Sequence, residues 1–242
     1  MDVTDGLCTI SGSEAVHIIK VLRMIPGDRL MLMDGTGNLY QALIKTVEGK
    51  QLVVAIEKLM PPSPSSPVRI ILCQALLKSR AMDGVVRSTS ELGVDGIVPF
   101  SSERTVVNLT EDRFRARARH WREIALNAAK QSCRRKPAQI ASLHTLESVI
   151  SQWEEEGDLK VILWEEEGAQ DLKTLLRASP RRKTFVGIVG PEGGFETREI
   201  HAATKAGFVS VSLGRRKLRA STAAISMVAI VQYEWGDLSL SH

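Results

Sequence analysis

Cysteine is scarce in this chain of 242 residues, which has only Cys8, Cys73 and Cys133 and no CxxC spacing. Three widely separated cysteines predict neither a disulfide framework nor a zinc site, so we expect reduced thiols and no metal. Long apolar runs are also missing, and none approaches the roughly 18 residues of a membrane span. The N-terminal MDVTDG lacks the basic start and apolar stretch of a signal peptide. We therefore expect a cytoplasmic protein.

A phosphate-binding motif is missing where one would be expected. The apolar run at residues 185–189 predicts a strand, and GPEGGF at residues 190–195 follows it, before a helix-like pattern. This loop matches neither GxGxxG of dinucleotide folds nor GxxxxGK[ST] of phosphate loops. Glu192 would repel a pyrophosphate, but it can accept hydrogen bonds or lie near a cation. S-adenosylmethionine, which carries a sulfonium and an amine but no phosphate, therefore fits better than NAD or ATP; an ordinary tight turn is the alternative.

Charge is unevenly distributed along the chain, although the net charge is only +4. Residues 101–140 hold ten Lys/Arg against four Asp/Glu, and residues 177–219 hold ten against three. An acidic stretch at residues 151–172 lies between them. The basic segments are either solvated faces or contacts for a polyanion, and a nucleic acid is the partner that such segments favour.

Proline is concentrated in MPPSPSSP, residues 60–67, which cannot hold a helix or a central strand and therefore predicts a linker. The elements predicted before it are strands over 29–33, 40–46 and 52–57 and a helix over 13–22, capped by Ser11 or Ser13. We expect a small β-rich domain over residues 1–66 and a second domain over residues 68–242.

The second domain shows an α/β pattern. Strands are predicted over 68–74, 97–100, 159–164, 184–189 and 208–213, and helices over 82–92, about 114–128 and 220–233. Gly93 is the expected C-cap of the first of these helices. Strands that alternate with helices predict βαβ units and a parallel sheet.

The last three predicted strands end in unusual loops. EEEG follows the first at residues 165–168, GPEGGF follows the second, and GRRKLR follows the third at residues 214–219. Ligands of open parallel sheets bind at the carboxyl ends of strands, so we expect the site to be formed by these loops.

Several motifs together resemble those of one known family. They are IVGPEGGF, VSLG about twenty residues later and LRxxTAA, preceded by Glu91-Leu92-Gly93-Val94, Pro99, Ser102-Glu103-Arg104, Gln131-Ser132-x-Arg134, His17-x-x-x-Val21-Leu22-Arg23 and Gly27-Asp28. In this order the set is similar to the SPOUT methyltransferases, and within them to the family that methylates N3 of a uridine in 16S ribosomal RNA (the RsmE family). The resemblance spans nearly the whole chain.

The resemblance implies a PUA-like β-barrel followed by a parallel-sheet SPOUT domain with a deep trefoil knot. It also implies a homodimer that acts on 16S ribosomal RNA or the small ribosomal subunit. The residues that it implies for binding S-adenosylmethionine are Leu163, Val189, Gly190, Pro191, Glu192, Gly193, Gly194, Leu213, Gly214, Leu218, Ser221, Thr222 and Ala223. We expect Gly193 and Gly194 to let backbone amides approach the ligand, and Leu163, Leu213 and Leu218 to be either ligand contacts or plain core.

Arg219 is the predicted catalytic residue. Methylation at N3 removes a proton from uridine, and a guanidinium next to the cofactor loop can stabilise the negative charge on the base. A phosphate clamp or a charge at a helix end is the alternative role, and the sequence indicates no general base.

The RNA-binding candidates are Arg23, Arg104, Arg122, Arg134 and Arg135, because arginine both forks onto phosphate and stacks on bases. His17 is more often a surface histidine than an RNA ligand, and Arg104 can instead pair with Glu103 or a partner subunit.

Two departures from the family pattern keep other functions open. Ser221 stands where the family usually has Glu, and Cys133 stands where it usually has Gly. The alternatives are a SPOUT methyltransferase for another RNA site and a non-catalytic RNA-binding factor in ribosome assembly.

Overall fold

The computed structural model describes residues 3–4, 6–34, 37–61, 66–107, 109–154, 159–168 and 170–238. By its internal contacts the chain divides into two compact units, Met1–Pro64 and Ser65–His242. Of the proline-rich segment predicted as a linker, residues 62–65 lie outside the described residues.

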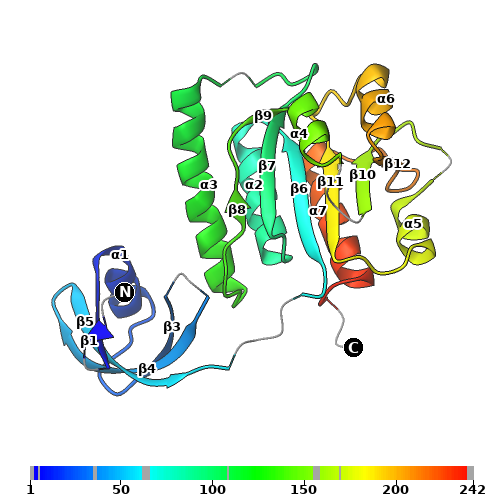
Figure 1. Ribbon diagram of the computed structural model, residues 1–242. Helices are drawn as coiled ribbons and strands as arrows, with labels where there is room; N and C mark the ends of the chain where they lie inside the picture. Colours follow the sequence, from blue (N-terminus) through cyan, green and yellow to red (C-terminus); the bar gives the residue numbers. More distant parts are fainter. Residues whose placement is uncertain are drawn as a thin grey trace. The chain divides into compact units, whose positions relative to one another are not determined.

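The first unit is an antiparallel sheet with one short helical segment (Figure 1). Its elements are β1 (Val3–Thr4), β2 (Leu7–Ser11), α1 (Gly12–Val16), η1 (His17–Val21), β3 (Arg29–Met33), β4 (Leu39–Glu48) and β5 (Gln51–Leu59). Within the described residues five strands pair in the order β1-β2-β5-β4-β3. The three predicted strands are confirmed, and β2 was not predicted.

The helix predicted over 13–22 is two pieces. It begins after Ser11, whose side chain makes no capping hydrogen bond, and it changes to π-helical geometry at His17. Ala15 and Ile18 point into a small core with Ile44 and Val54. A π-helical turn has no sequence periodicity of its own, so the pattern could not predict it.

The second unit is built on a parallel sheet. Its strands are β6 (Arg69–Ala75), β7 (Gly96–Ser101), β8 (Gln139–Ile140), β9 (His144–Thr145), β10 (Leu159–Leu163), β11 (Thr184–Val189) and β12 (Val209–Val211). Among the described residues the order is β12-β10-β11-β6-β7-β8, with β9 also paired to β7, and every one of these pairings is parallel. The predicted α/β class with a parallel sheet is confirmed.

Helices cover both faces of this sheet (Figure 1). They are α2 (Ser79–Glu91), α3 (Glu111–Gln131), α4 (Leu146–Gln152), α5 (Leu172–Ala178), α6 (Thr197–Lys205) and α7 (Ala220–Glu234). Alternate residues of β6 enter two separate cores: Ile70 packs with α2, α3, α5 and α7, and Ile71 packs with α4 and α6. A strand buried on both faces needs a continuous apolar run, which is what β6 and β11 have.

The last helix returns across the sheet. After β12 at the sheet edge, α7 packs against α2, β6 and β11 near the middle. Gly187 in β11 permits this close packing, because a Cβ there would overlap the thioether of Met227. Within the described ranges, no helix combines the length and the apolar character that a membrane crossing requires.

Candidate functional site

A cleft of about 1500 Å³ opens at the carboxyl ends of β10, β11 and β12. It is lined by the three loops that the sequence predicted as a site, together with the start of α7. Of the predicted cofactor residues, the structure brings together Leu163, Val189, Gly190, Pro191, Glu192, Gly194, Leu213, Gly214, Leu218, Ser221 and Ala223. Gly193 and Thr222 are not in this lining.

Glycine is suited to its three positions in GPEGGF for three different physical reasons. A Cβ on Gly190 would lie 2.9 Å from the Phe195 ring, so this glycine serves packing. A Cβ on Gly193 would lie 3.1 Å from Cβ of Arg104, so the absence of a side chain here accommodates a neighbouring loop. Gly194 has a φ of +72° and open space around its Cβ position. Its backbone therefore needs the left-handed region that glycine favours, and its amide donates to the Pro191 carbonyl at 3.0 Å while its Cα borders open space.

The loop after β10 supplies negative charge. Glu165, Glu166 and Glu167 line the cleft, as does Asp171 at the N-cap of α5. The Asp171 carboxylate accepts hydrogen bonds from the backbone amide of Thr174 at 2.9 Å and from its hydroxyl at 2.8 Å. The amide hydrogen bond, followed by the hydroxyl, holds the pKa of Asp171 below its usual value. This carboxylate therefore stays ionised at neutral pH.

The loop after β12 supplies positive charge to the cleft, and part of it meets the acidic loop. Arg215, Arg216, Lys217 and Arg219 line it there, and Lys217 Nζ lies 3.8 Å from a carboxylate oxygen of Glu165. Arg219 is the N-cap residue of α7, and its side chain is exposed. Its carbonyl accepts from the Ala223 amide at 2.8 Å, but its guanidinium has no hydrogen bond or ion pair within the described part of the chain. The Arg219 guanidinium therefore lines the cleft and is available to a ligand, as far as the described residues show.

Gln74 is a residue behind the cleft, in contact with the glycine loop, that the sequence analysis did not predict. It lies at the end of β6, fully buried, and its amide nitrogen donates to the carbonyls of Ala75 at 3.0 Å and Gly190 at 3.4 Å. Its Oε1 has no hydrogen-bond partner among the described residues. A glutamine that ends an otherwise apolar strand is the signal that could have found it. It ties the central strand to the start of the glycine loop.

A second loop, after β7, is fixed against GPEGGF. Arg104 donates to Glu196 at 2.8 Å and to the Gly193 carbonyl at 3.1 Å. The hydrogen bond to Glu196 raises the pKa of Arg104. The buried Glu199 carboxylate accepts from the amide of Glu103 at 3.1 Å and from that of Glu196 at 2.8 Å. Arg104 therefore lines the cleft with a guanidinium that is already engaged by its own chain.

The other RNA-binding candidates are dispersed. The Arg134 guanidinium is mostly buried and donates to the carbonyls of Ser90 and Val94, both at 2.8 Å, so it holds the end of α2. Burial lowers the pKa of Arg134. Arg122 is exposed on α3 and donates to the Ile140 carbonyl at 3.3 Å, whereas Arg135 is half-buried. Arg23 is exposed in the other unit, with a φ of 55°.

His17 and Cys133 both lie in unusual backbone. His17 is the exposed first residue of the π-helical turn η1. Cys133 has a φ of 56°, which is the left-handed region. The glycine that the family usually has at this position suits such a backbone, so the cysteine adds local strain.

The cleft fits S-adenosylmethionine by its lining. Leu163, Leu213 and Leu218 offer apolar contacts, and the carboxylates after β10 suit a ligand that carries an amine and a sulfonium. Gly194 is half-buried and its amide donates to the Pro191 carbonyl at 3.0 Å, so this position offers space for the ligand. No group of three or more His, Cys, Asp or Glu side chains suited to a metal ion occurs in the described segments.

Comparisons with known proteins agree with a methyltransferase cleft, and they cover most of the chain. The RNA methyltransferase domain family matches residues 64–232, and the RNA methyltransferase PUA domain family matches residues 10–57. The chain is 32% identical to ribosomal RNA small subunit methyltransferase E of Aquifex aeolicus, over 81% of either chain. It is 29% identical to the protein of the same name from Mycobacterium bovis, over 98% of this chain and 91% of the relative.

A solved structure matches as well. Ribosomal RNA small subunit methyltransferase E of Neisseria gonorrhoeae, bound to S-adenosyl methionine, superposes with a TM-score of 0.84 at 28% identity. The match covers 98% of this chain and 97% of that one. The predicted PUA-like domain is confirmed by these findings, and so is the predicted methyltransferase fold.

Proposed function

The chain belongs to the RNA methyltransferase family that includes ribosomal RNA small subunit methyltransferase E, and from this we propose that it transfers a methyl group from S-adenosylmethionine to 16S ribosomal RNA. The acceptor is N3 of one uridine. The observation that carries the proposal is the cleft at three neighbouring strand ends, which combines open space at Gly194, apolar walls, and both acidic and basic side chains. The acidic side chains of this lining suit a cationic cofactor, and the basic ones suit an anionic base.

In the reaction, S-adenosylmethionine supplies the methyl group, and the protein supplies position and charge. Leu163, Gly194, Leu213 and Leu218 hold the cofactor, and the loop around Gly190 is kept in place by Gln74. Loss of the N3 proton leaves negative charge on the ring nitrogen and the flanking carbonyl oxygens. Arg219 stabilises this charge with two hydrogen bonds, since a guanidinium carries two parallel donors and a permanent positive charge.

The proposal also includes a knotted chain, a dimer and a cytoplasmic location. The return of α7 from the sheet edge to the middle supports a trefoil knot formed by the last segment of the chain. The protein works as a homodimer in the cytoplasm and needs no metal. Ser221 takes the place of a family carboxylate, so proton removal relies on the environment of the base and not on that side chain.

Calorimetric titration with S-adenosylmethionine tests the site. Gly194→Val places a branched side chain in the cleft and should abolish detectable binding. Gly12→Val is the matched control, because Gly12 has a φ of +71° and open space around its Cβ position, as Gly194 has, but lies in the other unit. The two variants carry similar backbone strain, so Gly12→Val should bind like the wild type.

Equal affinity in a folded Gly194→Val protein would remove this loop from the cofactor site. A wild-type chain that binds small-subunit RNA but no S-adenosylmethionine would instead be the non-catalytic assembly factor.

A further inference from the structure

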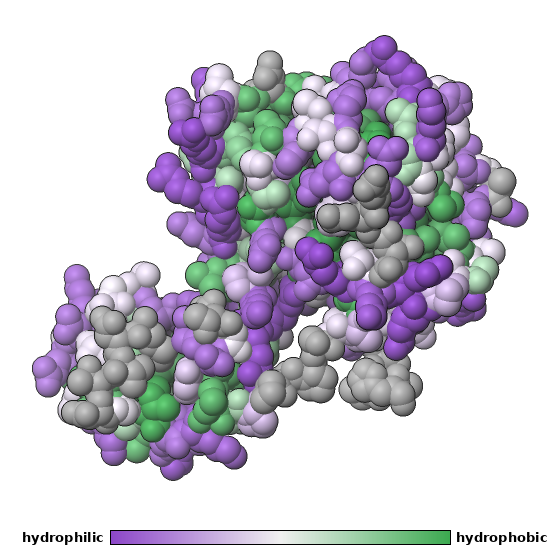
Figure 2. All heavy atoms as spheres, in the orientation of Figure 1, coloured by the Kyte–Doolittle hydropathy of each residue, from purple (hydrophilic) through white to green (hydrophobic). Residues whose placement is uncertain are grey.

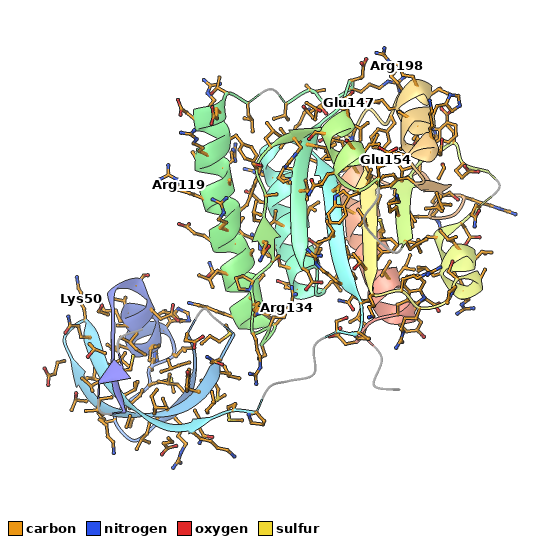
Figure 3. All side chains as sticks on the ribbon, viewed as in Figure 1. Lys50, Arg119, Arg134, Glu147, Glu154 and Arg198 are labelled. Atoms are coloured by element: carbon orange, nitrogen blue, oxygen red, sulfur yellow. The ribbon has the colours of Figure 1, made fainter. Side chains whose placement is uncertain are left out.

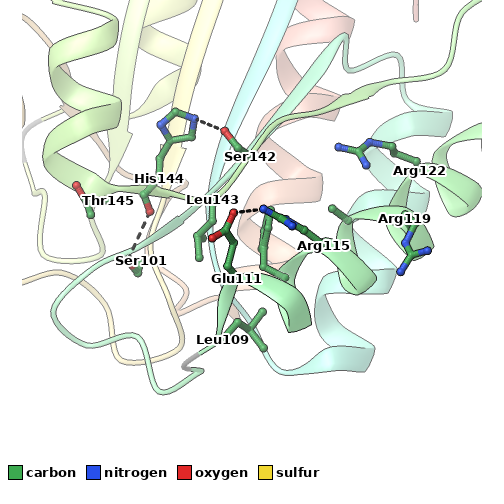
Figure 4. Close-up of a pocket in the computed structure, with 12 residues that line it drawn as sticks. Ser101, Leu109, Glu111, Arg115, Arg119, Arg122, Ser142, Leu143, His144 and Thr145 are labelled. Atoms are coloured by element: carbon green, nitrogen blue, oxygen red, sulfur yellow. Dashed lines mark hydrogen bonds and ion pairs between the residues drawn. The ribbon is translucent and has the colours of Figure 1, made fainter.

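A second cavity lies in the methyltransferase unit, at the carboxyl end of β7. It has a volume of about 800 Å³ and is lined by the first half of α3 and by residues 142–145 (Figure 4). Pockets of about 300–1,000 Å³ are typical of sites that hold small organic groups. None of the residues predicted for the cofactor lines it.

The wall of this second cavity is cationic. Arg115, Arg119 and Arg122 line it, and their spacing of four and three residues places them on one side of α3. Glu111 is its one acidic lining residue among the described residues, and it is paired with Arg115. Arg119 projects from α3 away from the sheet (Figure 3), and its side chain has no hydrogen bond or ion pair in the described ranges. Hydrophilic side chains also cover the outer side of α3 (Figure 2). Such a stripe fits a phosphate backbone.

The floor of the cavity is apolar, and hydrogen-bonding groups surround it. Leu109, Phe114 and Leu143 line it, with Phe114 almost fully buried. The His144 ring nitrogen Nε2 lies 3.3 Å from the Ser142 hydroxyl, and Ser101 donates to the His144 carbonyl at 3.5 Å (Figure 4). The other ring nitrogen, Nδ1, lies 3.2 Å from the Ser148 hydroxyl, so the imidazole is held in place by the chain. An apolar floor beside a fixed imidazole ring suits a flat heterocycle that packs against it. A phosphate site alone would not need such a floor.

The position of the cavity relates it to the cofactor cleft. All paired strands of the sheet are parallel. The carboxyl end of β7 therefore points to the same side of the sheet as the carboxyl ends of β10, β11 and β12. Ser101 lines the second cavity and Arg104 lines the cleft. Three residues of extended chain span at most about 11 Å, so the two sites are neighbours.

We propose that this cavity, lined by Arg115, Arg119, Arg122 and His144, binds an unpaired nucleotide of the RNA other than the one that is methylated. The base lies on Leu109, Phe114 and Leu143, and the arginines contact the phosphates. The occupant is single-stranded RNA, because bases of a duplex cannot leave the stack to enter a pocket without the cost of unpairing. The choice of RNA rests on the proposed function.

Fluorescence anisotropy with a labelled single-stranded RNA of about 12 nucleotides tests the phosphate contacts. Arg119→Ala should weaken binding about 5- to 10-fold and reduce the slope of log affinity against log salt by about one. Arg113→Ala is the matched control, since Arg113 is exposed on the same helix but outside the cavity lining. It should change the affinity less than twofold.

A second comparison tests the base. Leu143→Ala should weaken binding of the intact RNA several-fold but have little effect on an RNA of the same length with abasic sites. An equal effect on both RNAs would overturn the base-binding part. Equal losses of RNA affinity in Arg119→Ala and Arg113→Ala would overturn the site. Unchanged RNA affinity of Arg119→Ala together with a change in its sedimentation would also overturn it, because the cavity would then be a protein interface.

These measurements are made without S-adenosylmethionine and are therefore independent of methyl transfer. If Arg119→Ala binds RNA normally while the wild type methylates 16S ribosomal RNA, the cavity proposal alone is wrong. If the wild type does not methylate but Arg119→Ala loses RNA binding, the proposed function is wrong and the cavity stands.

Discussion

Arg219 lies at the start of α7 with its guanidinium directed to no partner within the described residues. If it stabilises charge that develops on uridine, its loss lowers kcat more than RNA affinity. By analogy with the removal of one oxyanion donor, Arg219→Ala should lower kcat roughly 10²- to 10³-fold. Arg219→Lys should recover part of this loss, because an ammonium keeps the charge but not the planar fork.

Single-turnover methylation at saturating RNA and cofactor measures this effect. Arg181→Ala serves as the control, since Arg181 is exposed and lines neither cavity. A near-normal rate for Arg219→Ala, together with weaker RNA binding, would make Arg219 a phosphate clamp.

Individual residues also show where sequence reasoning is limited. The motif indicated that Gly190, Gly193 and Gly194 are special, but only the fold separates packing against Phe195 and Arg104 from a positive φ. Arginine is equally ambiguous. The carbonyls that Arg134 contacts come from residues 40 and 44 positions away in the sequence, so nothing local could distinguish it from an RNA contact.

Helix α5 carries a pH-dependent cap. Asp171 accepts hydrogen bonds from Thr174, and its pKa is lower in the folded chain than the usual value of about 3.9. A carboxyl whose pKa is depressed by folding stabilises the fold above its unfolded pKa, and this contribution is lost as the pH falls through the folded pKa. Asp171→Ala should therefore cost about 1 kcal/mol of unfolding free energy at neutral pH, and the difference should shrink below about pH 4.

Urea unfolding between neutral and acidic pH measures that difference. Thr145→Ala is the matched control, because the uncharged Thr145 caps α4 by accepting from the Ser148 amide at 3.2 Å. Its cost should not depend on pH. If the cost of Asp171→Ala does not depend on pH, the hydrogen bonds of the cap stabilise α5 and the negative charge of Asp171 does not.

At the scale of elements, long periodic segments could be predicted and short ones could not. The strands β3 and β11 were predicted to the residue, and α7 to within one residue. Helices α4 and α5 have seven residues each, and β8 and β9 have two, which is too short for a period to appear. Their caps, Thr145 and Asp171, were the available signals.

At the scale of the whole molecule, α7 offers a surface through which two copies of the chain can associate. One side of this helix is buried on α2 and the sheet, but Ile225 and Ala229 stay half-exposed, and Tyr233 is 65% exposed. An apolar helix side of this kind suits a second copy of the chain. Ala229→Glu should therefore convert the proposed dimer to monomers in sedimentation experiments at micromolar concentration.

Ala202→Glu makes the same change at an exposed position of α6 and should leave the dimer intact. A wild-type chain that is monomeric and fully active would contradict the dimer.

The order of the sheet could not be predicted from local pattern. Alternating strands and helices predict parallel pairing, but the position of β11 between β10 and β6 follows from contacts between residues more than a hundred positions apart, such as Val186 and Ile71. The expected knot came from the family resemblance alone, because periodicity carries no information about threading.

The central claim is methyl transfer to 16S ribosomal RNA. Its most direct test uses small ribosomal subunits from a strain that lacks this chain, incubated with the purified protein and S-adenosylmethionine that carries a deuterated methyl group. Mass spectrometry of the digested RNA should find the label in 3-methyluridine at a single position of the 16S RNA, and in no other base. Absence of label from the 16S RNA, or label on another base, would contradict the account.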